Sequence, residues 1–249
     1  MKAKKSTVAI VLFLLFTAGK SNAQFYKDMS IGLNGGIYTY QGDLTPERFG
    51  SFKTIQPGLS LFVKKPINYF LAGRFHMSFA RLKGDESRYN NPEYRKERNF
   101  SFSTPVMEFS GQLVWNIFGR NYDDHGIQPY IFSGAGVALV SITKDYSRLN
   151  YAYFGETSDL YTGLAVDNVH GTPRALFSVP VGAGAEYPLS ERFSVNAEAS
   201  YRFIFTDYLD GFSQSASPKY KDHYHNISAG VIYKFGAKAR TKNVGCPVW

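Results

Sequence analysis

The stretch Phe193-Ser-Val-Asn-Ala-Glu-Ala-Ser-Tyr-Arg-Phe-Ile-Phe-Thr206 alternates apolar and polar side chains along its whole length. Its odd positions are apolar or aromatic, and its even positions carry most of the polar groups, including Glu198 and Arg202. A period of two is the pattern of a β-strand with one apolar face. The stretch is longer than an ordinary strand and suits a tilted strand that crosses a membrane, which needs about 9 to 11 residues.

Seven further stretches have a similar length, and most show the same alternation. They predict strands at 29–42, 54–63, 69–82, 100–117, 128–143, 174–187 and 224–235. In 100–117, Phe100 and Phe102 are out of phase with Phe109 and Trp115, and a bulge near Thr104-Pro105 would explain the slip. The stretch 128–143 is apolar at odd and even positions alike, so its faces stay unassigned.

The connections between the predicted strands alternate in length. Those at 43–53, 83–99, 144–173 and 207–223 are long, and those at 64–68, 118–127 and 188–191 are shorter. Outer-membrane barrels alternate in this way, with short periplasmic turns and long external loops. We therefore predict an all-β protein, an eight-stranded antiparallel transmembrane β-barrel in the outer membrane with both termini periplasmic. A soluble lipocalin-like barrel is the main alternative, but its outer face would be polar.

The N-terminus has the features of a secretory signal peptide. Basic residues precede an apolar run at 8–19, and Ser21-Asn22-Ala23 supplies the small residues of a cleavage site. The apolar run is too short to cross a bilayer as a helix. We predict that residues 1–23 are a cleaved signal peptide, 24–235 the outer-membrane barrel and 236–249 a periplasmic tail. Cys246 is the single cysteine, so the chain forms no internal disulfide.

A formal net charge of +8 and a sequence pI near 9.4 first suggest a nucleic-acid partner. However, only 19% of residues are charged and 16% are aromatic, which is typical of neither a basic tail nor a nucleic-acid-binding domain. Much of the basic excess lies outside the predicted barrel, at Lys2, Lys4, Lys5, Lys20, Lys238, Arg240 and Lys242. We expect outer-membrane lipids, and no nucleic acid, as partners of the barrel.

If odd-numbered residues face lipid, six charged side chains enter the lumen. They are Arg74, Glu108, Glu186, Glu198, Arg202 and Lys234. An eight-stranded barrel is just wide enough for side chains to fill it, so we predict an ion-pair network that plugs the interior. A conduit or a buried active site is the alternative. Gly182 and Gly184 are interpreted as positions where the absence of a side chain leaves space in this crowded lumen.

The sequence contains little candidate chemistry. His76 and Ser78 share a predicted face, but no carboxylate can be assigned to orient the imidazole for nucleophilic catalysis. The other histidines have no cysteine or acidic partners at the spacing of a metal site. We therefore predict no catalytic residue, no cofactor and no metal, and a protein that is not an enzyme.

Four segments resemble a known family. They are Gly36-Ile-Tyr-Thr-Tyr-Gln-Gly-Asp43, Arg98-Asn-Phe-Ser-Phe102 with Glu108, Gln128-Pro-Tyr-Ile-Phe132, and Tyr201-Arg-Phe-Ile-Phe-Thr-Asp-Tyr-Leu-Asp210. Together they are similar to the Bacteroidetes outer-membrane β-barrels that include PorG of the type IX secretion system. The sharpest piece is the rim motif, Thr206, Asp207, Tyr208, Leu209 and Asp210. Where the family often continues with a second aspartate, this chain has Gly211.

The resemblance implies a non-enzymatic barrel that is accessory to type IX secretion and associates with a periplasmic ring lipoprotein. It covers nearly the whole chain after the signal peptide and extends to related barrels with other roles. On the matching positions it implies architectural roles: Glu108 and Arg202 in the lumen, and Asp207 hydrogen-bonded to backbone at the rim.

Two surfaces remain for partners. The C-terminal tail carries Lys238, Arg240, Lys242 and Trp249, which either belong to a disordered segment or dock a periplasmic partner. The alternative function is a general structural or adhesin-like barrel acting through its extracellular loops. The longest of these, 144–173, holds five aromatic residues: Tyr146, Tyr151, Tyr153, Phe154 and Tyr161.

Overall fold

A computed structural model describes residues 28–47, 49–123, 125–155, 158–216 and 221–235. The predicted signal peptide and tail lie outside this range. The strands are β1 (Ser30–Gln41), β2 (Gln56–Pro66), β3 (Leu71–Asp85), β4 (Ser101–Asn116), β5 (Gln128–Val140), β6 (Thr143–Asp145), β7 (Ala175–Pro188), β8 (Phe193–Ile204) and β9 (His223–Lys234). The helices are α2 (Tyr94–Arg98), α3 (Tyr151–Phe154) and α4 (Asp159–His170), with 3-10 turns η2 (Phe52–Thr54) and η3 (Glu86–Arg88). The described helices include none that is long and apolar enough to cross a membrane.

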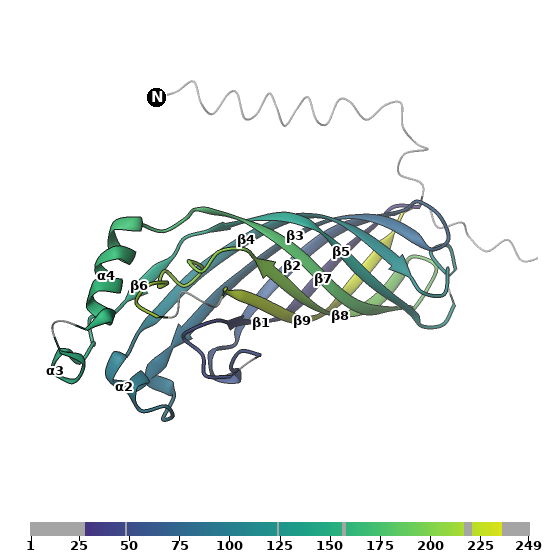
Figure 1. The fold of residues 1–249 in the computed structure, drawn as a ribbon. Coiled ribbons are helices and arrows are strands. Elements are labelled where there is room, and N and C mark those ends of the chain that lie inside the picture. Colours follow the sequence, from purple (N-terminus) through teal and green to yellow (C-terminus); the bar gives the residue numbers. More distant parts are fainter. Residues whose placement is uncertain (1–27, 48, 124, 156–157, 217–220, 236–249) are drawn as a thin grey trace, which may run out of the picture.

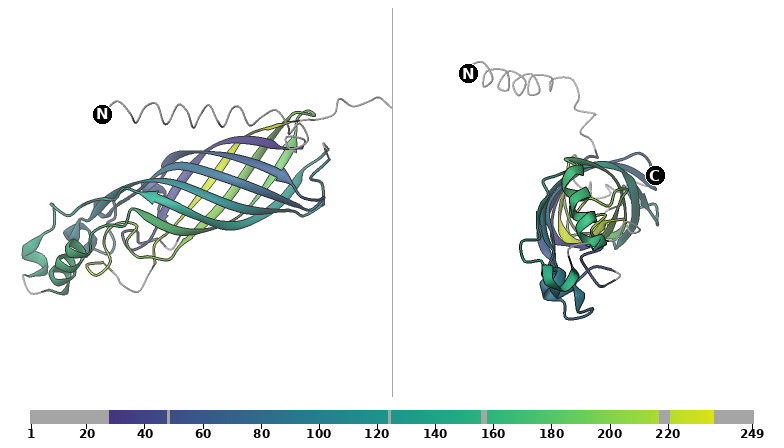
Figure 2. Two further views of the ribbon diagram at one scale, coloured as in Figure 1. Left: turned by 90° about the horizontal axis from the view of Figure 1, so that it is seen from above. Right: turned by 60° about the vertical axis from the view of Figure 1, so that its left-hand side comes forward.

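Eight long strands close into an antiparallel barrel, which confirms the predicted fold class. Each long strand pairs with its neighbours along the chain, and β1 completes the ring by pairing with β9. The short β6 lies outside the ring and pairs with the first residues of β4. Figure 2 shows the closed ring, with α4 in front of one opening.

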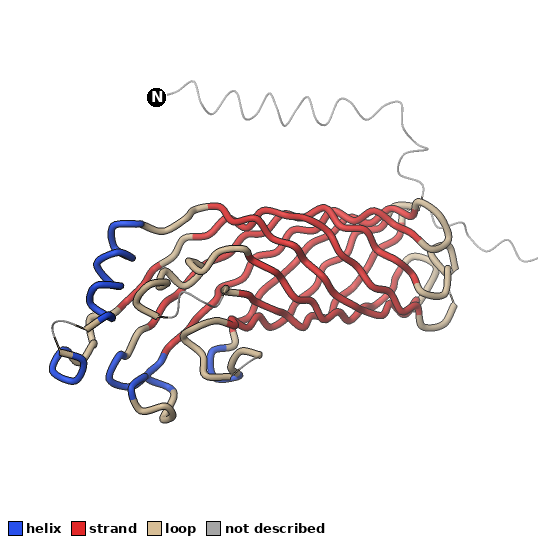
Figure 3. Tube along the Cα trace, viewed as in Figure 1, coloured by secondary structure: helices blue, strands red, loops and turns tan. Residues whose placement is uncertain are grey.

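The two ends of the barrel differ. The end that carries 42–55, 86–100, 141–174 and 205–222 is called the loop end, and the end that carries 67–70, 117–127 and 189–192 is called the turn end. Every described helix lies at the loop end (Figures 1 and 3). The alternation of long and short connections therefore separates the described loops from the turns, as the sequence predicts.

The strand faces follow residue parity around the whole barrel. In β8, Phe193 and Phe203 are exposed, whereas Ser194 and Arg202 are buried. The cross-strand pairs join odd residues to odd residues throughout, as in Val181 with Tyr201 and Phe203 with His223. The outer wall is consequently apolar, which suits lipid and excludes the soluble lipocalin-like alternative.

The predicted bulge near Thr104-Pro105 is wrong. β3 and β4 keep one unbroken register through this point, with Leu82 opposite Thr104 and Arg81 opposite Pro105. Phe102 faces inward because the interior at the loop end is itself apolar. Apolar residues move from the odd to the even positions there because the interior changes from polar in the middle of the barrel to apolar at the loop end.

An apolar core fills the barrel interior at the loop end. The rings of Phe100 and Phe212 stack with centroids 4.4 Å apart, and Tyr40 meets Phe102 edge-on at 4.6 Å. Leu164 of α4 packs into the same core. The long connections therefore fold over the mouth of the barrel as a cap with its own hydrophobic core.

Glycines make room for rings in the narrower part of the lumen. A Cβ at Gly182 would lie 2.4 Å from the Cζ of Phe132, its cross-strand partner, and one at Gly32 would lie 2.2 Å from the Cζ of Phe62. Each ring lies against the glycine opposite it on the neighbouring strand, where no side chain occupies the space. The glycines thereby leave space for aromatic rings inside the barrel.

Candidate functional site: the lumen and the loop-end cap

The first charge cluster of the lumen centres on Arg74. Its Nη1 pairs with Glu198 Oε1, and its Nε donates to Gln112 Oε1 at 2.7 Å. The guanidinium lies 4.1 Å from the ring centroid of Phe132, and the Tyr130 hydroxyl donates to Glu198 Oε1 at 2.7 Å. The aromatic residues of β5, whose faces the sequence leaves unassigned, thus point inward around this ion pair.

The second cluster joins Arg202 to Glu108. The Arg202 Nε lies 3.5 Å from Glu108 Oε2, and the Tyr224 hydroxyl donates to the same oxygen at 2.5 Å. The Arg202 Nη1 also donates to Ser200 and Asn226. Both charged side chains are almost completely buried.

The third cluster lies nearer the turn end and has two cations for one carboxylate. Glu186 accepts from Lys64 Nζ at 2.5 Å and pairs with Lys234 Nζ at 3.3 Å. Lys64 is absent from the predicted set because the predicted strand ended at Val63. β2 continues to Pro66, and the parity of the strand then brings Lys64 inward.

The six charged residues predicted for the lumen thus lie there in three ion-paired groups. Each carboxylate has a cation and a hydroxyl or second cation beside it. Because an unpaired charge in such an interior is costly, this pairing fits a plug better than a conduit.

His76 does not form a catalytic arrangement in the described structure. The side chains of His76 and Ser78 are both buried in the lumen, and the His76 Nδ1 has no hydrogen-bond partner. A histidine base needs a partner that orients its ring and a nucleophile within hydrogen-bond reach. Within the described ranges, no cluster of three or more His, Cys, Asp or Glu side chains is placed to hold a metal ion.

The rim motif joins distant segments of the cap. Leu209 is fully buried; its N–H donates to Asp222 Oδ2 at 3.0 Å, and its carbonyl accepts from the Thr104 hydroxyl at 3.0 Å. Thr206 Oγ1 accepts from the Tyr208 N–H at 3.3 Å. Gly211, which directly follows the rim motif, has a φ of +86°, a region that favours glycine.

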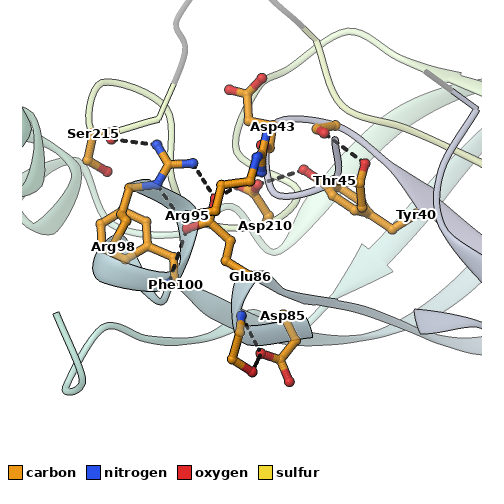
Figure 4. A network of polar contacts seen from close by, with 12 residues as sticks. Tyr40, Asp43, Thr45, Asp85, Glu86, Arg95, Arg98, Phe100, Asp210 and Ser215 are labelled. Carbon is orange, nitrogen blue, oxygen red and sulfur yellow. Dashed lines mark hydrogen bonds and ion pairs between the residues drawn. The ribbon is translucent and has the colours of Figure 1, made fainter. Parts of the chain in front are cut away.

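Asp210 and Asp222 share the hydroxyl of Tyr40 (Figure 4 shows Tyr40 and Asp210). The Tyr40 oxygen lies 2.6 Å from Asp210 Oδ2 and 2.6 Å from Asp222 Oδ1. A phenol has one proton, so the second short contact requires a protonated carboxyl group that donates to the phenol oxygen. Complete burial raises the pKa of both carboxyl groups well above the usual range, and the charge of Asp210 raises that of Asp222 further.

The role expected for Asp207 is wrong. Among the described residues no backbone N–H donates to either carboxylate oxygen of Asp207, and the polar group beside it is the Ser213 side chain. Desolvation raises the pKa of Asp207 to about 6. The backbone contacts expected of Asp207 are made instead by Asp210, which accepts from the Phe212 N–H at 2.8 Å, and by Asp222. Asp210 lies in the turn after β8 and Asp222 directly precedes β9, and both carboxylates are buried.

Asp167 of α4 is hydrogen-bonded to the β8–β9 connection. Its carboxylate accepts from the N–H groups of Ser213, Gln214 and Ser215 at 3.0 to 3.2 Å, and from the Ser215 hydroxyl at 2.6 Å. One turn earlier, Gly163 lets the helix approach, since a Cβ there would lie 2.4 Å from the Gln214 carbonyl oxygen. Asp167 is fully buried, and the sequence alone does not single it out.

Glu86 is the centre of a second buried polar network in the cap (Figure 4). It accepts from Arg95 Nη1 at 2.9 Å and from Arg98 Nε at 2.9 Å. Arg95 also donates to the Asp43 carbonyl at 2.9 Å, and Arg98 to the Ser215 carbonyl at 3.4 Å. The β3–β4 connection is thereby hydrogen-bonded to the β1–β2 connection through Asp43 and to the β8–β9 connection through Ser215.

The Tyr40–Asp210–Asp222 cluster predicts that raising the pH weakens the cap. A carboxyl group whose pKa is raised by folding stabilises the fold when protonated, and this contribution is lost as pH rises through the folded pKa. The loss begins near pH 4, where unfolded carboxyl groups ionise, and continues up to the folded pKa values, which for Asp210 and Asp222 lie well above the usual range. Hydrogen-exchange protection factors of the Leu209 and Phe212 amides should fall by about tenfold or more between pH 5 and pH 8.

Asp222→Asn is the matched variant for this prediction. An asparagine stays neutral and still accepts from the Leu209 N–H, so its protection factors should change less over the same range. Equal protection of the wild-type amides at pH 5 and pH 8 would contradict a shared proton at this cluster.

An apolar outer wall, a lumen filled with paired charges and long connections gathered at one end define a small outer-membrane β-barrel. The chain belongs to the family defined by the outer membrane protein beta-barrel domain, whose model matches residues 8–235. Its place is the outer membrane, where lipids contact the wall.

Several solved structures are similar to the chain. Ail, the attachment invasion locus protein of Yersinia pestis, is 12% identical, with 83% of this chain and 97% of that one covered and a TM-score of 0.45. Neisserial surface protein A is 15% identical, with 84% and 98% covered and a TM-score of 0.45. The outer membrane enzyme PagL is 14% identical, with 82% and 97% covered and a TM-score of 0.39. No curated protein matches the sequence.

Proposed function

We propose that the protein is a non-enzymatic, closed barrel that acts by contact, as an accessory component of the type IX secretion machinery. The main support is that the interior is occupied. Three ion-paired clusters fill the lumen, and a hydrophobic core closes the loop end. The surfaces that remain for partners lie at the two ends.

The residues of the family resemblance support the assignment to this family of secretion barrels. Tyr40, from the segment 36–43, and Asp210, from the rim motif, are hydrogen-bonded although they are far apart in the sequence. Glu108, which is matched together with the segment 98–102, and Arg202, which lies in the same segment as the rim motif, form an ion pair. The matching positions are thus the ones that hold the barrel and its cap together, as expected of an architectural signature.

We place both termini in the periplasm and the docking surface for a ring lipoprotein at the turn end, continued by the tail. Two connections at the turn end are joined to each other. The Asn121 side chain donates to the Asn68 carbonyl at 2.8 Å, its N–H donates to the Tyr69 carbonyl at 3.2 Å, and the rings of Tyr69 and Tyr122 meet edge-on at 5.4 Å. A fixed surface of this kind binds without the cost of ordering a loop.

Deleting the gene is expected to abolish or strongly reduce export of type IX cargo, measured as cargo protein in the culture medium. A plasmid copy of the full chain should restore export. A copy that ends at Gly236 tests the tail, and it should recover less ring lipoprotein than the full chain in a pull-down from solubilised membranes. Normal export in the deletion strain would refute the secretion role, and equal recovery would refute docking through the tail.

A second function is favoured by one observation at the loop end. Tyr151 and Tyr153 of α3 and Val166 and Val169 of α4 are exposed side chains in the 144–173 connection. Exposed apolar groups on a folded loop are typical of a binding surface. If export is normal in the deletion strain, loss of surface attachment in the same strain would assign the barrel to this adhesin-like role.

A further inference from the structure

The β1–β2 connection presents the two most exposed aromatic side chains of the described residues. Phe52 is 85% exposed and Phe49 is 74% exposed. Both are phenylalanines, so neither ring has a hydroxyl group that water can hydrogen-bond. Two such rings, three residues apart in one connection, form a surface that is stabilised by contact with another apolar surface.

The connection is folded and holds these rings outward. Leu44, near its start, is fully buried in the core of the cap. At its other end the Ser51 hydroxyl accepts from the Lys53 N–H at 3.3 Å, and the Thr54 N–H donates to the Ser51 carbonyl at 3.3 Å, which closes η2. Ser51 and Thr54 are buried, so Phe52 lies on the exposed side of η2.

The connection lies where the apolar outer wall ends. η2 lies beside β1 and β3, and one residue separates it from the start of β2. From the middle of the barrel toward the loop end, the outward residues of these strands carry no polar side chain up to Ile37 on β1, its partner Pro57 on β2, and Phe79 on β3. Figures 1 and 3 show that the connection stays closer to the strands than α3 and α4 do.

Cations follow the apolar wall on the same side of the barrel. Arg81, two residues beyond Phe79 on β3, is exposed, and the Lys53 Nζ donates to the Arg88 carbonyl at 2.9 Å. Aromatic rings next to Lys and Arg at the end of an apolar band are typical of the interface between a bilayer and water. The exposed rings are thus continuous with the lipid-facing wall, and this continuity favours lipid over a protein partner.

We propose that the β1–β2 connection is seated in the bilayer leaflet that surrounds the loop end, with Phe49 and Phe52 inserted among the acyl chains. Its backbone suits this position because the Thr45, Gly50 and Thr54 N–H groups donate within the connection at 3.0 to 3.3 Å. The partner is the apolar lipid surface, and no particular head group is required. Because Leu44 belongs to the core of the cap, the bilayer restrains one of the segments that close the barrel.

A nitroxide spin label tests whether position 52 lies in lipid or in water. The full chain carries Cys246→Ser, which removes the single native thiol, and Phe52→Cys, and the labelled protein is folded into phosphatidylcholine vesicles. Collisions of the label are measured with oxygen, which concentrates among acyl chains, and with a water-soluble nickel chelate. We expect the ratio of oxygen to nickel collisions to be close to that of Leu59→Cys, on the outward face of β2, and several-fold higher than that of Tyr151→Cys in α3.

Phe49→Cys is the second test site, because it keeps the Phe52 ring, and it should give the same high ratio. Ratios at both positions equal to that of Tyr151→Cys would overturn the proposal, since the connection would then lie in water. Labels shielded from both reagents would also overturn it, because a protein surface, such as a second copy of the chain, would then cover the rings.

Discussion

Replacing Glu198 by leucine is expected to lower the free energy of unfolding by about 3 to 5 kcal/mol. Glu198 pairs with Arg74, and both side chains are almost completely buried in the lumen. Leucine removes the carboxylate and leaves the guanidinium with Gln112 and the faces of two rings. The charge then has no counterion in a place that water reaches poorly, which is the most costly outcome for a buried pair.

The double variant Arg74→Met/Glu198→Leu is the matched control for this prediction. Removing both charges removes the uncompensated cation, so most of the lost stability should return. Both chains are compared with the wild type by urea unfolding from lipid vesicles. An unfolding midpoint of Glu198→Leu equal to that of the wild type would contradict a lumen held by ion pairs.

Replacing Asp167 by alanine is expected to release α4 from the β8–β9 connection while the barrel stays folded. The change removes the buried carboxylate that accepts hydrogen bonds from three backbone N–H groups, and it leaves these groups without an acceptor. Each unsatisfied buried donor costs about 1 to 3 kcal/mol. Amide exchange at Ser213 to Ser215 should therefore accelerate by about a hundredfold, measured by mass spectrometry of peptides from the folded protein.

Asn168→Ala is the control for the cap. Asn168 is the next residue of α4 and is exposed, and its side chain donates to the Tyr146 hydroxyl at 3.1 Å. Its replacement should leave exchange in the β8–β9 connection unchanged. If the amides of Ser213 to Ser215 exchange at the same rate in Asp167→Ala and in Asn168→Ala, the buried carboxylate does not stabilise the cap.

The strands and their faces are readable from the sequence because backbone geometry is local. A strand has a period of two, so the alternation from Phe193 onward gives both the element and its lipid-facing side. The same rule brings Arg202 and Glu198 inward. The rule missed Lys64 because the predicted strand ended at Val63, three residues before the end of β2 at Pro66.

The bulge predicted near Thr104-Pro105, which the structure does not contain, shows the limit of predicting strand faces from alternation. Phe100 and Phe102 are out of phase with Phe109 if the inner face must be polar, yet the register of β3 with β4 is unbroken. The inner face becomes apolar at the loop end because Phe212 and other cap residues fill it. A pattern of alternation reports a change of environment, but it cannot say what the new environment is.

The sequence by itself determined the eight strands, the inward and outward faces of those that alternate clearly, and the division into long and short connections. These depend on the repeat of the backbone and on the contrast between lipid and lumen. Only the tertiary structure decided which groups meet in the cap: Tyr40 reaches Asp210 and Asp222 across separations of 170 and 182 residues, and Asp167 reaches Ser215 across 48. The loops have no repeating pattern, and a buried carboxylate in a loop looks like a solvated one until the segments that pack around it are in place.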